Sequence, residues 1–108
     1  MRIIKVEDLH ADAGWRTLSW IKVTTDEGLV GWAEVSEGMG GPGMIQVIRR
    51  MAELVIGADP RDVGPIGSRL YLMNQMTQGG MIAQAIAAIE NACLDIKGKA
   101  AGLPVYDL

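Results

Sequence analysis

Hydrophobic and polar positions follow two different periods along the chain, and the change of period divides it into two parts. Residues 2–9, 18–25 and 29–35 are rich in β-branched and apolar side chains with partial period-two alternation, the pattern of half-buried strands. After residue 43 the apolar positions recur every three or four residues, which is typical of amphipathic helices. The pattern predicts an α+β domain in which three strands precede three helices.

The connections between these elements predict the topology. Only Asp26, Glu27 and Gly28 separate the second strand from the third, so the two strands must pair antiparallel. The helices are expected at residues 44–57, 59–76 and 81–99. Asp59 and Pro60 suit the start of the second helix, whereas Pro65 predicts an irregular first turn. We therefore expect a three-stranded antiparallel meander backed by a three-helix bundle.

Composition and charge exclude several classes of protein. With 108 residues, 49% of them hydrophobic and 21% charged, the chain has the composition of one ordered globular domain. A net charge of −3 without a basic stripe argues against nucleic-acid binding, and no apolar stretch approaches the roughly 20 residues of a membrane span. The first residues do not resemble a signal peptide, and Cys93 is a single cysteine on an apolar helical stripe. We expect a cytoplasmic protein with a buried, inert thiol.

A glycine-rich segment, GMGGPG at residues 38–43, matches the G-x-G-x-x-G pattern of dinucleotide-binding turns. It also follows a predicted strand and precedes a predicted helix. However, that strand is the third of an antiparallel meander and not the first of a parallel β-α-β unit. Pro42 further lacks a backbone N–H that could bind phosphate. A dinucleotide-binding module is therefore an alternative that these two features disfavour.

Three segments resemble the N-terminal capping domain of the mandelate racemase / muconate lactonising enzyme family of the enolase superfamily. They are KVTTDEGLVGWAE at residues 22–34, IGADP at 56–60, and AAIENACLDIKGKAAGLPVY at 87–106. They cover most of the chain in the order of that family. Two positions depart from its usual pattern: Ala33 stands where glycine is common and Leu94 where tryptophan is common.

The resemblance implies a larger Mg²⁺-dependent enzyme that abstracts the proton α to a carboxylate and stabilises the enediolate on the metal. Residues 1–102 would be the capping domain and residues 103–108 the start of a linker into a (β/α)8 barrel. Every catalytic base and metal ligand would then follow Leu108, so no catalytic, cofactor-binding or metal-binding residue is assigned within the chain. The full-length protein is expected to be a homo-oligomer.

A sugar acid is the expected substrate, because the short first loop and the Gly79-Gly80 entry to the last helix resemble the galactonate dehydratase branch of the family. Racemisation and cycloisomerisation are the alternative reactions within the family. A free-standing interaction domain is the alternative from another class.

In this family two loops of the capping domain close over the barrel, and the matching segments here are residues 10–17 and 36–43. The candidate substrate-gating residues are His10, Asp12, Trp15 and Arg16 in the first loop and Glu37 and Met39 in the second. Arg16 is able to pair with a substrate carboxylate, although an exposed surface arginine is an equal interpretation. Trp15 is equally a core or interface residue, and His10, Asp12 and Glu37 are otherwise solvent-facing. The spacing of those last three side chains gives no support to a shared metal site.

Overall fold

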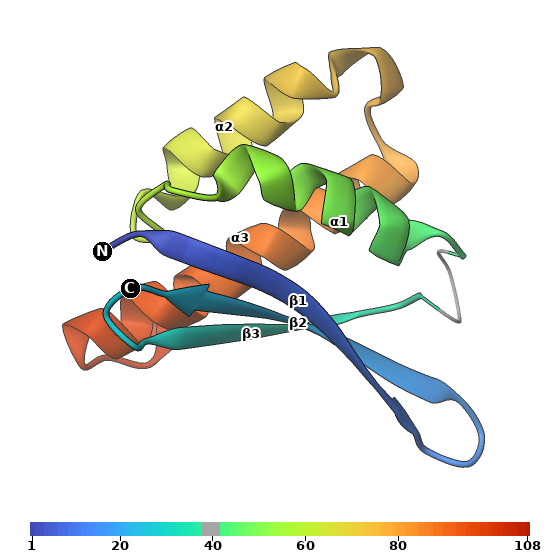
Figure 1. Ribbon diagram of the computed structural model, residues 1–108, viewed down its shortest axis with the longest axis horizontal. Coiled ribbons are helices and arrows are strands. Elements are labelled where there is room, and N and C mark those ends of the chain that lie inside the picture. Colours follow the sequence, from blue (N-terminus) through green and yellow to red (C-terminus); the bar gives the residue numbers. More distant parts are fainter. Residues whose placement is uncertain (38–41) are drawn as a thin grey trace.

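A computed structural model of the protein describes residues 1–37 and 42–108, and it has the predicted α+β architecture (Figure 1). The strands are β1 (Ile3–Asp12), β2 (Thr17–Thr25) and β3 (Val30–Val35). The helices are α1 (Met44–Val55), α2 (Val63–Met73) and α3 (Gly80–Ala101), with 3-10 turns η1 (Gln75–Thr77) and η2 (Val105–Asp107). No helix in the described part of the chain is long and apolar enough to span a membrane.

The three strands form one antiparallel sheet in the order β1-β2-β3. Gly28 takes a φ of 84° in the turn between β2 and β3, a conformation that costs glycine little. Ile21 and Val23 of β2 are fully buried, whereas Lys22, between them, faces the opposite side of the sheet. The period-two alternation of the sequence therefore corresponds to the buried and the outer face of the sheet.

The helices gather over that inner face, while the β1–β2 hairpin extends beyond them (Figure 1). α3 packs along β2 and β3, and α1 and α2 pack on α3. The core contains residues from every strand and all three long helices. Its largest fully buried apolar side chains include Ile3, Ile21, Met44, Ile48, Met51, Leu70, Ile89 and Ile96.

α3 and β3 approach each other closely enough for their backbones to touch. A Cβ atom on Gly31 would overlap the carbonyl oxygen of Ala92 and lie 2.7 Å from Cγ1 of Ile96. At the same place Asp95 Oδ2 accepts a hydrogen bond from the Trp32 N–H at 2.9 Å, and Lys99 Nζ donates to the Val30 carbonyl oxygen at 2.7 Å. Side chains of α3 thus form hydrogen bonds with backbone N–H and C=O groups on the outer edge of β3. Such groups are otherwise unpaired at the edge of a sheet.

Several predicted boundaries were wrong. α2 begins at Val63 and not at Asp59, because Asp59 accepts hydrogen bonds from Arg61 and forms a separate turn. Pro65 therefore occupies the first turn of the helix, where a missing N–H does no harm, and the expected irregularity is absent from this turn. β1 continues to Asp12, three residues beyond its predicted end. Residues 103–108, expected as the start of a linker, contain the turn η2.

Candidate functional site

The β1–β2 hairpin projects past the end of β3. Asp12 pairs with Thr17, whereas the last pairing of β3 joins Val35 to Ser19. Only residues 13–16 form the turn, which is closed by a hydrogen bond from the Ala13 N–H to the Arg16 carbonyl oxygen at 2.9 Å. The antiparallel pairing places this tip and the segment after β3 at the same end of the sheet (Figure 1).

Asp12 lies at the end of β1 and holds the hairpin turn. Its Oδ1 accepts a hydrogen bond from the Gly14 N–H at 2.8 Å, the arrangement of an Asx-turn. Gly14 takes a φ of 88° there. The expectation that His10 and Asp12 belong to a loop was therefore wrong. The longer β1–β2 pairing makes both residues part of a strand.

His10 belongs to a chain of polar contacts that we call the Asp8 network, made of Asp8, His10, Ser19 and Arg49. His10 Nε2 lies 2.7 Å from Asp8 Oδ2, and Nδ1 lies 2.7 Å from the Ser19 hydroxyl oxygen. Arg49 of α1 donates from Nε and Nη2 to the two Asp8 oxygens at 2.8 and 2.9 Å. The network thus ties β2, β1 and α1 together.

The Arg49 guanidinium lowers the pKa of Asp8 to about 2, and the hydrogen bond from His10 adds to this effect. Because an ionised carboxylate only accepts hydrogen bonds, Nε2 of His10 carries a proton and donates it. In the neutral ring, Nδ1 then accepts from the Ser19 hydroxyl. The sequence offered one signal for this network, since Asp8 and His10 share a strand face. It offered none for Arg49, which is 41 residues away.

Trp15 and Arg16 occupy the hairpin tip. The Trp15 side chain is 74% exposed, and the Arg16 guanidinium carbon lies 4.8 Å from the centre of its ring. Arg16 Nη2 donates to Glu34 Oε1 of β3 at 3.2 Å, while Arg16 Nε is buried without a partner among the described residues. The tip therefore presents an aromatic surface and a cation whose hydrogen-bonding capacity is partly unused.

Glu37 binds the N-terminus of α1. Its Oε1 accepts from the Gly43 N–H at 2.9 Å and its Oε2 from the Ile45 N–H at 2.8 Å. A carboxylate is stabilised there because the first N–H groups of a helix lack intrahelical partners and carry the positive end of its dipole. The other candidate from this segment, Met39, lies outside the described residues.

The contacts of Glu37 also argue against a dinucleotide site. In such a site the helix N–H groups after the glycine-rich turn bind pyrophosphate. Here a carboxylate of the protein already occupies them. The preceding strand is moreover the edge of an antiparallel sheet. Both observations disfavour the dinucleotide-binding interpretation of residues 38–43.

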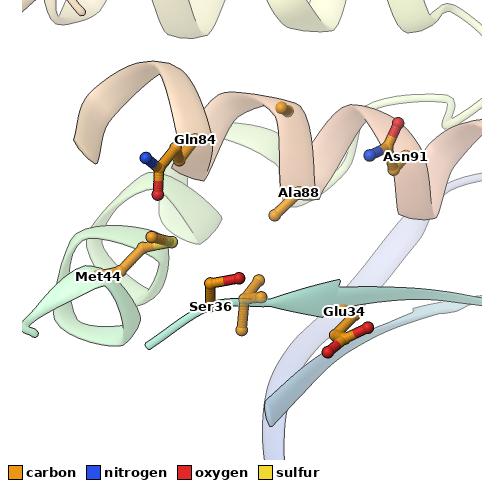
Figure 2. A pocket seen from close by; sticks show the side chains of 8 residues that line it. Glu34, Ser36, Met44, Gln84, Ala88 and Asn91 are labelled. Carbon is orange, nitrogen blue, oxygen red and sulfur yellow. The ribbon is translucent and has the colours of Figure 1, made fainter. Parts of the chain in front are cut away.

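A crevice of about 440 Å³, which we call the β3–α3 crevice, opens beside the end of β3 (Figure 2). Figure 2 shows Gln84 and Ala88 of α3 pointing toward this end of the strand, with the Glu34 side chain pointing away from α3. The crevice is lined by Glu34, Val35, Ser36, Met44, Gln84, Ala87, Ala88 and Asn91. Sequence reasoning missed Gln84 and Asn91, because the helical pattern alone does not say which polar residues meet the strand edge.

The described residues do not form a metal centre. No three His, Cys, Asp or Glu side chains converge within residues 1–37 and 42–108. His10, Asp12 and Glu37 each have a different partner, namely Asp8, the Gly14 N–H and the N-terminus of α1. The donor set of a hard divalent cation is therefore not assembled by these three side chains.

The family model for the mandelate racemase / muconate lactonizing enzyme N-terminal domain matches residues 12–108 of the chain. The chain belongs to this family. The resemblance predicted from three sequence segments is thereby confirmed. The segment at residues 87–106 includes Asp95 and Lys99, the α3 residues that bind the edge of β3.

Curated relatives of this mandelate racemase-type domain include D-galactonate dehydratases. The enzyme from Xanthomonas axonopodis pv. citri is 38% identical and that from Pectobacterium atrosepticum 37%, each over 109 aligned residues that cover all of this chain. The chain spans only 28% of the length of these relatives.

Solved structures agree with this assignment. A protein from Burkholderia xenovorans strain LB400, provisionally named an L-alanine-DL-glutamate epimerase, is 38% identical with a TM-score of 0.95. That match covers 99% of this chain and 27% of the solved chain. A second structure under the same name, bound to magnesium and fumarate, is 39% identical with a TM-score of 0.94 and covers 98% of this chain and 26% of its own.

Proposed function

We propose that the chain is the capping domain of a larger, metal-dependent enzyme that removes the proton α to a carboxylate, and that the enzyme is a sugar-acid dehydratase. The observation that carries the proposal is the position of Arg16 and Trp15. The hairpin that bears them projects beyond the packed body, at the same end of the sheet as the segment after β3. The match of D-galactonate dehydratases to the whole chain supports this choice of reaction.

Arg16 is the residue most suited to meet a carboxylate substrate. A guanidinium binds carboxylates through paired hydrogen bonds, and Nε of Arg16 has no partner among the described residues. Trp15 offers an exposed apolar surface beside it. Closing such a tip over a barrel would exclude water from the reacting carbons, which strengthens every electrostatic interaction there.

The remaining parts of the proposal concern the rest of the protein. Residues 1–102 form the capping domain and residues 103–108 begin the linker into the barrel. In this family the metal ligands and the catalytic bases belong to the barrel, so we propose that they lie outside residues 1–108. We further infer a cytoplasmic location, with which the free thiol of the single Cys93 agrees, and a homo-oligomeric full-length protein.

Racemisation or epimerisation is the second candidate reaction. It is favoured by the 38–39% identity and high TM-scores of the Burkholderia structures, whose name is that of an epimerase. Both reactions begin with the same proton abstraction, so the capping domain by itself does not distinguish them. Dehydration removes water and leaves a keto-deoxy acid, whereas epimerisation returns an isomer of the substrate.

The full-length enzyme tests the proposal. Incubated with magnesium and D-galactonate, it is expected to form a keto-deoxy acid that proton NMR detects. Residues 1–108 alone are expected to be inactive. In the full-length enzyme, Arg16→Ala should raise KM for the carboxylate substrate by roughly 10-fold or more, because it removes a charged hydrogen-bond donor. If Arg16→Ala turns over the substrate with an unchanged KM, Arg16 has no part in binding it. If the wild-type enzyme neither binds carboxylates nor acts on them, the proposed function is refuted.

A further inference from the structure

We propose that Glu34 is an internal competitor for the substrate carboxylate. In this inference the Glu34 carboxylate occupies Arg16 in the free enzyme, the incoming carboxylate displaces it, and Glu34 thereby sets the affinity for the substrate. The inference rests on the proposed function, because it requires that Arg16 receive a carboxylate.

The geometry of the Arg16–Glu34 pair differs from that of the two arginine–aspartate pairs in the same molecule. Arg49 and Arg61 each use Nε and Nη2 together to bind both oxygens of Asp8 and Asp59. Arg16 donates only from Nη2 to Glu34, at 3.2 Å. The Nε donor on the same edge of the Arg16 guanidinium therefore has no hydrogen-bond partner among the described residues.

The unpaired Nε of Arg16 allows a bound carboxylate to form a hydrogen bond that Glu34 does not form. Arg16 Nε is buried, so a carboxylate reaches it only when the Arg16 side chain turns outward. A carboxylate that then binds Nε and Nη2 together removes the penalty of a buried donor without a partner. The centre of the Trp15 ring lies 4.8 Å from the guanidinium carbon, and this cation–π contact favours an Arg16 side chain that stays at the hairpin tip. Glu34 reaches only one of the two donors, so a better placed carboxylate outcompetes it.

Exposure makes the exchange easy. The Glu34 side chain is 51% exposed and that of Arg16 is 27% exposed. Ion pairs at this level of exposure are weak because water solvates the separated charges well. Glu34 also lies at the margin of the β3–α3 crevice, and its side chain points away from α3 (Figure 2).

The test is Glu34→Gln in the full-length enzyme, with D-galactonate as substrate and fumarate as a second carboxylate probe. We expect KM for D-galactonate and Kd for fumarate to fall by up to about five-fold, the factor that corresponds to an exposed ion pair. The change should appear in KM and not in kcat, because Glu34 contacts Arg16 and not the reacting atoms. It should shrink as salt is added.

Matched variants separate competition by Glu34 from a general effect of charge. Glu7→Gln removes one negative charge from the same sheet face, where Glu7 pairs with Lys5 and Lys22, and should leave both constants unchanged. In an Arg16→Ala background, Glu34→Gln should have no effect. Glu34→Asp keeps the charge but shortens the reach to Nη2, so a smaller fall in KM is expected, and this variant serves if Glu34→Gln fails to fold.

The outcomes also separate this inference from the proposed function. If Arg16→Ala raises KM but Glu34→Gln leaves it unchanged or raises it, the competition is refuted while the role of Arg16 stands. If Arg16→Ala leaves KM unchanged, Arg16 does not receive the substrate and both statements fail. If neither D-galactonate nor fumarate binds the wild-type enzyme, the proposed function fails and the inference fails with it.

Discussion

The contact between β3 and α3 leads to a quantitative prediction for Gly31→Ala. The added Cβ would overlap the carbonyl oxygen of Ala92, a backbone atom that cannot rotate away. The strands and helix cannot separate easily there, because hydrogen bonds from Trp32 to Asp95 and from Lys99 to Val30 join them at the same level. Overpacking costs about 1–3 kcal/mol, and an overlap with a fixed backbone atom belongs at the upper end of that range, while the lost flexibility of glycine offsets about 0.5–1 kcal/mol.

We therefore expect Gly31→Ala to lower the free energy of unfolding by roughly 2 kcal/mol. For a domain of this size each kcal/mol corresponds to about 4–8 °C, so Tm should fall by roughly 10 °C. Thermal and urea unfolding followed by circular dichroism measure the change, and an unaltered urea m-value would show that the same surface is exposed on unfolding.

Gly67→Ala is the matched control. Its Cβ would also overlap an atom of α3, but that atom is Oε1 of Glu90, the mobile end of a long side chain. Glu90 can move aside, and alanine is the better helix former by about 1 kcal/mol, so this variant should be neutral or slightly more stable. If Gly31→Ala proved as stable as Gly67→Ala, the backbone contact between β3 and α3 would not be the constraint that we describe.

Three further predictions concern single groups. The Arg49 guanidinium lowers the pKa of Asp8 from 3.8 to about 2. The stabilisation by this pair is therefore complete above pH 4 and is lost as the pH falls from about 4 to 2. Asp8→Asn should flatten the dependence of Tm on pH in that interval. Burial raises the pKa of Cys93 to about 12, so the native thiol should not react with iodoacetamide at pH 8 while the urea-unfolded thiol should, and rapid labelling of native protein would contradict this. Glu37→Ala should lower the free energy of unfolding in urea by about 1 kcal/mol, because it removes the carboxylate from the N-terminus of α1. NAD should not raise the Tm of the wild-type protein or of Glu37→Ala, and a rise would support the dinucleotide-binding interpretation.

Local sequence patterns predicted which strands and helices form, but they did not predict every residue at which these elements begin and end. The second helix was placed too early because Asp59 and Pro60 satisfy the usual rules for a helix start. The structure assigns the Asp59 carboxylate to Arg61 and starts the helix at Val63 instead. β1 was ended too early because His10 and Asp12 are polar, and polar residues in a strand depend on partners that a single-sequence pattern does not identify.

The sequence by itself determined the order of strands and helices, the antiparallel pairing of the second and third strands, and the membership in the family, because these follow from periodicity, from a three-residue connection and from short segments of contiguous residues. Only the tertiary structure decided what the polar residues do. It brought Arg49 to Asp8, Glu37 to the N-terminus of α1, and Glu34 to Arg16, through contacts between residues separated by 41, 8 and 18 positions. Such pairings depend on how the elements pack, because a charged side chain has many potential partners until the backbone places one within hydrogen-bonding distance.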